Sequence, residues 1–218
     1  MSASAHRRLH DPRYLVGHWP LNGHARDVSG HGNHITGVRA PKFTTGPFSS
    51  HQIGTLTGNN HWEGGTGIGA LLGAACSSAS ISCMVYATSV AGNDGVVSIS
   101  SAFGLTSGKM ELKVGFETWG LKVGAVSSST PATANSWVHL VGSWNGATQS
   151  LYVNSVPLDS DANTTALDFT GLASGFGVYY LTGSGGGFCL NGSLANVRLY
   201  NIALTGDEIF SLYEYDKR

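Results

Sequence analysis

The chain has 218 residues, which is enough for one domain with a sizeable hydrophobic core. Charged residues make up only 11% of it and the net charge is −1, so nothing drives it electrostatically toward nucleic acid or an anionic membrane surface. No apolar run approaches the roughly 18 residues that a bilayer-spanning helix needs, which argues against membrane insertion.

The N-terminal segment differs from the rest of the chain. Residues 1–13 are polar and show no periodicity, which predicts a flexible arm followed by a single domain over residues 14–218. The arm carries basic residues with no apolar segment behind them, so it does not have the pattern of a signal peptide.

Short alternating segments follow, separated by turn signals. Asn22-Gly23, Asn145-Gly146 and Asn191-Gly192 are typical hairpin turn pairs, and the chain contains 31 glycines. Residues 110–114 alternate apolar and charged side chains, and residues 121–123 repeat that alternation. Short strands with glycine-rich turns predict an antiparallel β-sandwich or jelly roll.

The C-terminal segment changes from strand to helix. Residues 194–200 suit a strand that is buried on both faces. Thr205 and Glu208 form a capping box, and Ile209 and Leu212 supply apolar positions after it, which predicts a helix near residues 206–213. The predicted fold is therefore an all-β, antiparallel jelly-roll sandwich with one short C-terminal helix.

Three sequence blocks, in chain order, carry a resemblance to a known family. They are Gly17–Leu21 with Asp27–His34, then Trp137–Asn154, then Gly192–Ile209 with its Val-Arg-Leu-Tyr-Asn run. Together they resemble the laminin G-like, concanavalin A-like lectin superfamily, in the branch that includes pentraxin-like domains, over roughly residues 14–215. The resemblance implies a jelly roll whose N-terminal strand, near residues 15–21, lies beside the C-terminal strand.

The resemblance implies a non-catalytic, lectin-like carbohydrate-binding domain that is extracellular or secreted and has glycans or glycoproteins as partners. A homo-oligomer formed by pairing of edge strands is a further possibility. A protein-interaction or adhesion module without sugar binding is the alternative, because this fold carries several functions. A polysaccharide-active enzyme is a third alternative, but the 13 acidic residues nowhere form the paired-carboxylate pattern of jelly-roll glucanases.

A structural calcium ion is a further expectation from the resemblance. The loop from Asp27 to Asn33 offers a carboxylate, an amide and a glycine-bent backbone, which are oxygen donors that calcium accepts. Relatives complete such a site with an aspartate of the C-terminal strand. Here that position is Ala195 with Asn196 beside it, so the expected ligands are Asp27, Asn33 and Asn196.

Two segments combine a tryptophan with polar groups, as sugar sites do. Asn60, His61, Trp62 and Glu63 form one of them, although the resemblance also gives Trp62 a core position. Trp119 is the other candidate. It stacks on a sugar if it lies at a hairpin tip, and it belongs to the core if its strand continues, because it then shares a face with Leu121 and Val123.

Three cysteines leave the redox state open. Cys83 lies in an apolar strand and is expected to be a small buried hydrophobic residue. Cys76 and Cys189 could pair in an oxidising compartment, and an odd count leaves at least one thiol free.

Overall fold

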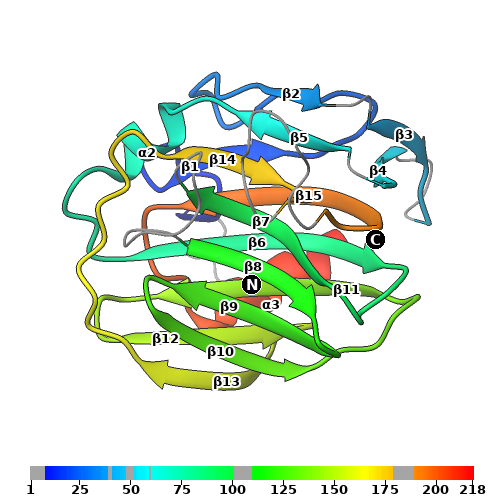
Figure 1. Ribbon diagram of the computed structural model, residues 1–218. Coiled ribbons are helices and arrows are strands. Elements are labelled where there is room, and N and C mark those ends of the chain that lie inside the picture. Colours follow the sequence, from blue (N-terminus) through cyan, green and yellow to red (C-terminus); the bar gives the residue numbers. More distant parts are fainter. Residues whose placement is uncertain (1–7, 39–40, 48–51, 59, 101–109, 179–188) are drawn as a thin grey trace.

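A computed structural model describes residues 8–38, 41–47, 52–58, 60–100, 110–178 and 189–218. Within these residues, antiparallel strands form two sheets that pack face to face (Figure 1). The eight-stranded sheet has the order β13-β12-β11-β6-β15-β4-β3, with β1 pairing β15 off this path. Its strands are β13 (Val156–Ala162), β12 (Thr148–Val153), β11 (Trp137–Trp144), β6 (Ala79–Ala87), β15 (Gly192–Tyr200), β4 (Gln52–Leu56), β3 (Lys42–Thr45) and β1 (Leu15–Trp19).

The seven-stranded sheet faces the viewer in Figure 1 and has the order β10-β9-β8-β7-β14-β5-β2. Its strands are β10 (Val126–Pro131), β9 (Thr118–Val123), β8 (Met110–Gly115), β7 (Asn93–Ser100), β14 (Ala173–Phe176), β5 (His61–Gly64) and β2 (Ile35–Val38). The predicted jelly-roll sandwich is confirmed. The predicted pairing of the terminal strands is confirmed as well, since β1 runs antiparallel to β15 with Trp19 opposite Val197.

The main core lies between the sheets and contains four buried tryptophans. Trp19, Trp62, Trp119 and Trp144 are each at most 2% exposed and belong to one apolar cluster. Alternation along the strands produces this cluster, because every second side chain points inward. β15 is buried on both faces as predicted, because a second apolar cluster covers its outer side.

That second cluster lies between the outer face of the eight-stranded sheet and the C-terminal helix α3 (Gly206–Asp216). Ile209 and Leu212 of the helix pack there against Tyr200 of β15. Burying such side chains contributes about 1.5–3 kcal/mol each. A short helix α2 (Gly67–Leu72), which the sequence did not predict, closes one end of the sandwich beside β14 and β1.

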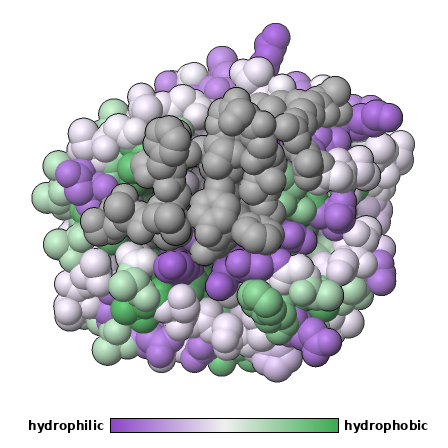
Figure 2. Space-filling view, viewed as in Figure 1, coloured by the Kyte–Doolittle hydropathy of each residue, from purple (hydrophilic) through white to green (hydrophobic). Residues whose placement is uncertain are grey.

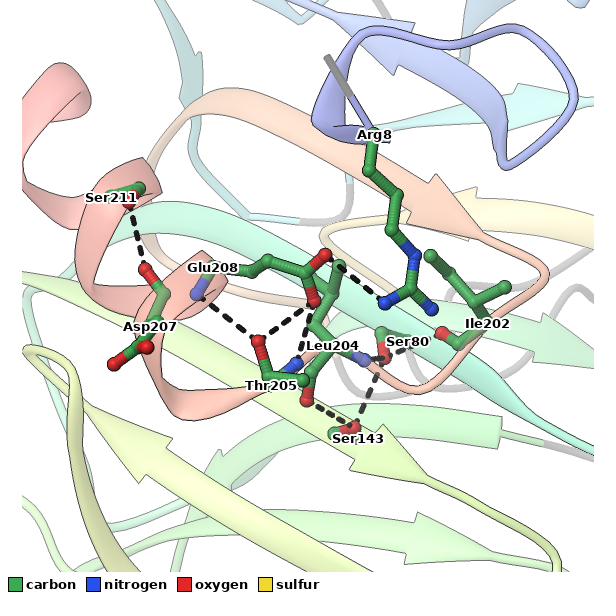
Figure 3. A network of polar contacts seen from close by, with 9 residues as sticks. All are labelled: Arg8, Ser80, Ser143, Ile202, Leu204, Thr205, Asp207, Glu208 and Ser211. Atoms are coloured by element: carbon green, nitrogen blue, oxygen red, sulfur yellow. Dashed lines mark hydrogen bonds and ion pairs between the residues drawn. The ribbon is translucent and has the colours of Figure 1, made fainter. Parts of the chain in front are cut away.

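The predicted capping box starts α3 (Figure 3). Glu208 N donates to Thr205 Oγ1 at 3.4 Å, and Thr205 N donates to Glu208 Oε2 at 2.8 Å. Ser80 Oγ lies 3.2 Å from Ser143 Oγ and accepts from Leu204 N at 3.0 Å, which fixes the chain just before the helix. These bonds satisfy backbone groups that the start of a helix leaves unpaired.

The segment before β1 is packed against this helix. Leu9 is 2% exposed in the second cluster, and its carbonyl oxygen accepts from Tyr200 Oη at 3.3 Å. Arg8 Nη1 lies 3.2 Å from Glu208 Oε1. The flexible arm predicted over residues 1–13 therefore does not extend through residues 8–13, because Leu9 gains an apolar contact that polarity alone did not suggest. Residues 1–7 lie outside the described residues.

A buried ion pair joins the end of α3 to β15. Arg198 donates from Nη1 and Nη2 to the two carboxylate oxygens of Asp216 at 2.6 and 2.8 Å, and both side chains are at most 1% exposed. His139 of β11 lies beside this pair, with its Nε2 2.9 Å from Ser82 Oγ and 4.0 Å from Asp216 Oδ2. Burial, with the Arg198 charge adding to it and Asp216 opposing it, lowers the pKa of His139 to about 4.

The three cysteines are free and buried. Cys83 is 0% exposed in the main core, which agrees with its expected role. Cys76 and Cys189, whose pairing the sequence left open, do not form a disulfide. Their backbones pair with different segments, Cys76 with Leu167 and Cys189 with Gly95 and Val178. No helix in the described part of the chain is long and apolar enough to cross a membrane.

Removing one partner of the buried ion pair should be costly. We expect Asp216→Asn to lower the free energy of unfolding by about 3–5 kcal/mol, because Arg198 stays buried without a counter-charge. The matched control is Glu214→Gln on the same helix, since its pair with Lys217 is partly exposed and worth at most about 1 kcal/mol. Denaturant unfolding at neutral pH measures both, and equal losses would contradict the role of the pair.

Acid should weaken the docking of α3. A histidine in the unfolded chain titrates near pH 6.5, so the unfolded state binds more protons than the folded state between about pH 6.5 and 4. His139 therefore does not lower the free energy of unfolding above about pH 6.5. As the pH falls to 4.5, its titration lowers the free energy of unfolding by about 2–3 kcal/mol. His139→Gln should show a shallower loss in denaturant unfolding across this range. An identical slope would exclude His139 as the source.

Candidate functional site

Trp119 is in the core and not at a hairpin tip. It is 1% exposed on β9 and points inward together with Leu121 and Val123. The turn between β8 and β9 is instead made by Phe116 and Glu117, both with positive φ angles, of 51° and 59°. The expectation that Trp119 stacks on a sugar is therefore wrong, because the strand continues through it.

Trp62 is also a core residue and is 2% exposed on β5. Its ring fills the space above Gly54, where an added Cβ would come within 2.4 Å of it, and lies 5.8 Å from the ring of Phe43. The sequence left open whether Trp62 belongs to a sugar site or to the core, and the structure places it in the core. It offers no face to a ligand.

The polar residues around Trp62 are mostly engaged within the chain. Asn60 Oδ1 accepts from Thr57 N at 2.8 Å and closes the turn before β5. His61 is 3% exposed, and its Nε2 lies 2.9 Å from Glu63 Oε1. Only Glu63 is partly exposed. Asn60, His61 and Glu63 therefore do not assemble around an exposed aromatic ring, which was the basis for expecting a sugar there.

The loop with Asp27 is held by its own carboxylate. Asp27 accepts from the backbone N–H groups of His18, Ser29 and Asn33, each at 2.9 Å. Although burial raises the pKa of Asp27, these donors outweigh it and the pKa is lowered. The carboxylate thus ties the loop to β1.

The other two expected calcium ligands lie on either side of β1. Asn33 Nδ2 donates to Val16 O at 3.2 Å, whereas Asn196 is on β15, where its N donates to Pro20 O at 3.2 Å. Among the described residues, no group of three or more His, Cys, Asp or Glu side chains is placed to hold a metal. Calcium binding stays a prediction, and it would have to rely on amide and backbone oxygens beside Asp27.

A pocket of about 350 Å³ opens where β15 changes its neighbour. Residues 192–194 of β15 pair with β4, and residues 197–200 pair with β1. A bulge lies between these two stretches, and Asn196 within it has a φ angle of 50°. Bulges interrupt the ladder and re-aim side chains, and this one leaves a gap between β4 and β1.

The pocket is lined by groups from four parts of the chain. Its apolar floor includes Ile53 of β4 and Ala195 of β15, and the C-terminal end of α3 borders it with Tyr215 and Asp216. Tyr215 is 57% exposed, and the Arg198 guanidinium lies 5.9 Å from its ring centre. Amide side chains complete the lining, from Asn22, Gln52 and Asn196.

His18 of β1 adds a buried nitrogen to the lining. Its Nε2 is inaccessible to solvent and has no hydrogen-bond partner among the described residues. Burial, reinforced by the Arg198 and His10 charges, lowers the pKa of His18 to about 3, although the Asp27 charge and a hydrogen bond with the Asn196 side chain oppose the shift. The ring is therefore neutral at physiological pH.

Ser82, His139 and Asp216 bring a serine, a histidine and an aspartate side chain close together. Ser82 and His139 are 0% exposed, and the hydroxyl and the carboxylate both approach the same imidazole nitrogen, Nε2. A catalytic triad needs an accessible serine and uses the two nitrogens separately. This set therefore positions α3 and has no catalytic geometry.

Glu63 and Glu111 lie in one row of the seven-stranded sheet, separated by β14 and β7, which is about 14 Å across three strand spacings. Glu63 is partly exposed and Glu111 is buried. Paired glycosidase carboxylates lie about 5–10 Å apart. On the outer face of this sheet the described surface is mostly hydrophilic or intermediate, with small separate hydrophobic areas (Figure 2).

A comparison with protein families gives the chain its relatives. The laminin G family model described as the concanavalin A-like lectin/glucanases superfamily matches residues 69–210. The chain belongs to this superfamily. The predicted resemblance is thereby confirmed at the level of the superfamily. No curated protein sequence matches the chain significantly.

Solved structures with the same fold include carbohydrate-associated domains. Domain 4 of AbnA, an extracellular GH43 arabinanase from Geobacillus stearothermophilus in complex with arabinotriose, has a TM-score of 0.72 at 15% identity. The match covers 91% of this chain and 98% of that domain. The binding domain of botulinum neurotoxin DC in complex with SialylT has a TM-score of 0.68 at 11% identity, with 95% of this chain and 52% of that one covered. The binding domain of Paraclostridial Mosquitocidal Protein 1 has a TM-score of 0.70 at 15% identity, with 94% and 53% covered.

The chain spans nearly all of the arabinanase domain but about half of the toxin binding domains. At these identities the likeness concerns the fold alone. The binding properties named for those proteins therefore do not identify a site in this chain.

Sequence reasoning missed Tyr215, Asn22 and Gln52. Ile209, Leu212 and Asp216 mark the buried side of α3, and Tyr215 falls outside that stripe. An aromatic residue off the apolar stripe of a short helix was the available signal. The sequence around Asn22 and Gln52 contained no such signal, because these residues meet only in the folded chain. There, Gln52 N donates to Asn22 Oδ1 at 2.9 Å.

The calcium prediction can be separated from the structural role of Asp27. We expect Asp27→Ala to destabilise the domain by about 1–3 kcal/mol, because three backbone donors lose their acceptor. If calcium binds at this loop, a chelator lowers the Tm of the wild type but leaves that of Asp27→Ala unchanged. Thermal melts with and without chelator check this, and a wild-type Tm that chelator does not move would exclude the ion.

Proposed function

We propose that this domain is a non-catalytic carbohydrate-binding module whose ligand occupies the pocket between β4 and β1. The observation that carries the proposal is the pairing of exposed Tyr215 with the amide side chains of Asn22, Gln52 and Asn196 in one pocket. A tyrosine ring packs on the apolar face of a sugar, and amide and imidazole groups exchange hydrogen bonds with hydroxyls.

The charges of the pocket support a ligand rich in hydroxyl groups. Asp216 is already bonded by Arg198 through both carboxylate oxygens, so it is not an unpaired anion that would demand a cationic ligand. The remaining polar lining consists of the neutral side chains of His18, Asn22, Gln52 and Asn196 and of the charged Arg218. The neutral groups suit sugar hydroxyls, and Arg218 allows the sugar to carry an acidic group.

Family membership and fold neighbours support the same class of ligand. The superfamily includes lectins, and the arabinanase domain is described with arabinotriose while related toxin domains are described with SialylT or gangliosides. Arabinotriose and sialylated oligosaccharides are therefore sensible first probes, alongside a general glycan array.

We expect the wild-type domain to bind members of a glycan array, and Tyr215→Ala to weaken the tightest of them by tenfold or more. The reason is the loss of a stacking surface worth about 1–3 kcal/mol, by analogy with other aromatic platforms. Tyr215→Phe should keep most of the affinity. Isothermal titration calorimetry measures all three proteins.

The matched control is Phe210→Ala, because Phe210 is 54% exposed on the same helix but does not line the pocket. It should bind as the wild type does. A silent array would contradict carbohydrate binding and favour an adhesion module, and consumption of a glycan during incubation would indicate an enzyme. Equal losses in Tyr215→Ala and Phe210→Ala would move the site away from the pocket.

A further inference from the structure

The apolar floor of the pocket continues beyond it on the outer face of the eight-stranded sheet. Ile53 and Ala195 form a small apolar cluster with Met84 of β6, and Trp137 of β11 packs against this cluster. The cluster is separate from the two larger cores, so it neither joins the sheets nor docks α3. It connects the pocket directly to an aromatic side chain that is only partly buried.

Trp137 is paired with a second aromatic residue at this position. Trp137 lies directly opposite Tyr86 in the register of β11 and β6, with ring centres 5.8 Å apart at an interplanar angle of 45°. Both side chains are partly exposed, and Tyr86 Oη donates to Asn135 Oδ1 at 3.4 Å. The pair therefore presents ring surface beside the pocket without belonging to the main core.

Hydroxyl groups continue the same row across the next two strands, and Lys42 of β3 follows opposite Thr55. Ser193 of β15 lies opposite Tyr86 on one side and opposite Thr55 of β4 on the other. Thr55 Oγ1 lies 3.5 Å from Ser193 Oγ and 2.6 Å from Thr44 Oγ1 of β3. Side chains on neighbouring strands are about 5 Å apart, so these residues lie next to the aromatic pair. Ser193 is only 8% exposed, whereas Thr55 is partly exposed and Thr44 is exposed.

We infer that the pocket and this row form one extended face with at least two subsites, and that the ligand is therefore an oligosaccharide chain. The inference rests on the proposed carbohydrate-binding function. Ser193 precedes the pocket residue Ala195 by two positions, which is about 7 Å along the strand. One sugar unit stacks on Tyr215 in the pocket, and its neighbour lies over Tyr86 and Trp137 with its hydroxyls toward Thr55 and Thr44.

The test compares sugars of increasing length within one series. The probes are arabino-, xylo-, cello- and manno-oligosaccharides of one to six units, titrated by calorimetry into the full chain. We expect affinity in the preferred series to rise at least tenfold from the shortest member that binds to the longest. A rise that ends after the second or third unit gives the number of subsites.

Variants then locate the second subsite. Trp137→Ala and Tyr86→Ala should each remove most of the increase in affinity with sugar length. Both should leave the affinity for the shortest sugar that binds unchanged. Tyr86→Ala serves on its own if Trp137→Ala fails to fold, as judged by thermal melting. The control is Phe116→Ala, which removes an aromatic ring that is 73% exposed at the β8–β9 turn. It should change neither the affinity for the shortest sugar nor the affinity for longer ones.

The outcomes separate this inference from the proposed function. Binding that does not strengthen with length overturns the extended face but leaves the single-sugar pocket. A gain with length that survives both Trp137→Ala and Tyr86→Ala overturns the assignment of the second subsite. If the chain binds no member of the four series and no glycan of the array, the proposed function itself is overturned.

Discussion

The ion pair between Arg198 and Asp216 is the interaction on which the outer side of this molecule depends. Taking both charges out of water is costly, and two short hydrogen bonds repay that cost only while α3 stays on the sheet. Tyr215 directly precedes Asp216, so the same pair sets where its ring lies. The helix that buries the outer face of β15 thus also builds one wall of the pocket, and the stability of this region and the shape of the pocket are linked.

The second constraint is the bulge in β15. Asn196 adopts a left-handed conformation, which asparagine tolerates better than most residues, and its backbone N–H turns to Pro20. The strand can then pair with β4 before the bulge and with β1 after it. Such irregularities gather at functional sites, where they cost stability but aim polar groups. Here the bulge brings Asn196 and His18 to one opening.

Local patterns in the sequence predicted the architecture well. Alternation gave the strands, Thr205 and Glu208 gave the start of α3, and three sequence blocks gave the superfamily. The same reasoning failed for Trp119, because nothing local distinguishes a hairpin tip from a strand when Phe116 and Glu117 make a turn without glycine or asparagine. The pocket could not be predicted because its residues are far apart in the chain and meet only through the bulge and the docked helix.

The most direct test of the account follows backbone amide signals by NMR while the tightest-binding oligosaccharide is titrated into the 22.7 kDa chain. The account predicts the largest shifts at Ala195, Asn196 and Tyr215, extending to Tyr86 with longer sugars. Shifts centred on Glu63 and Lys122, on the outer face of the seven-stranded sheet, with none around Asn196, would contradict it.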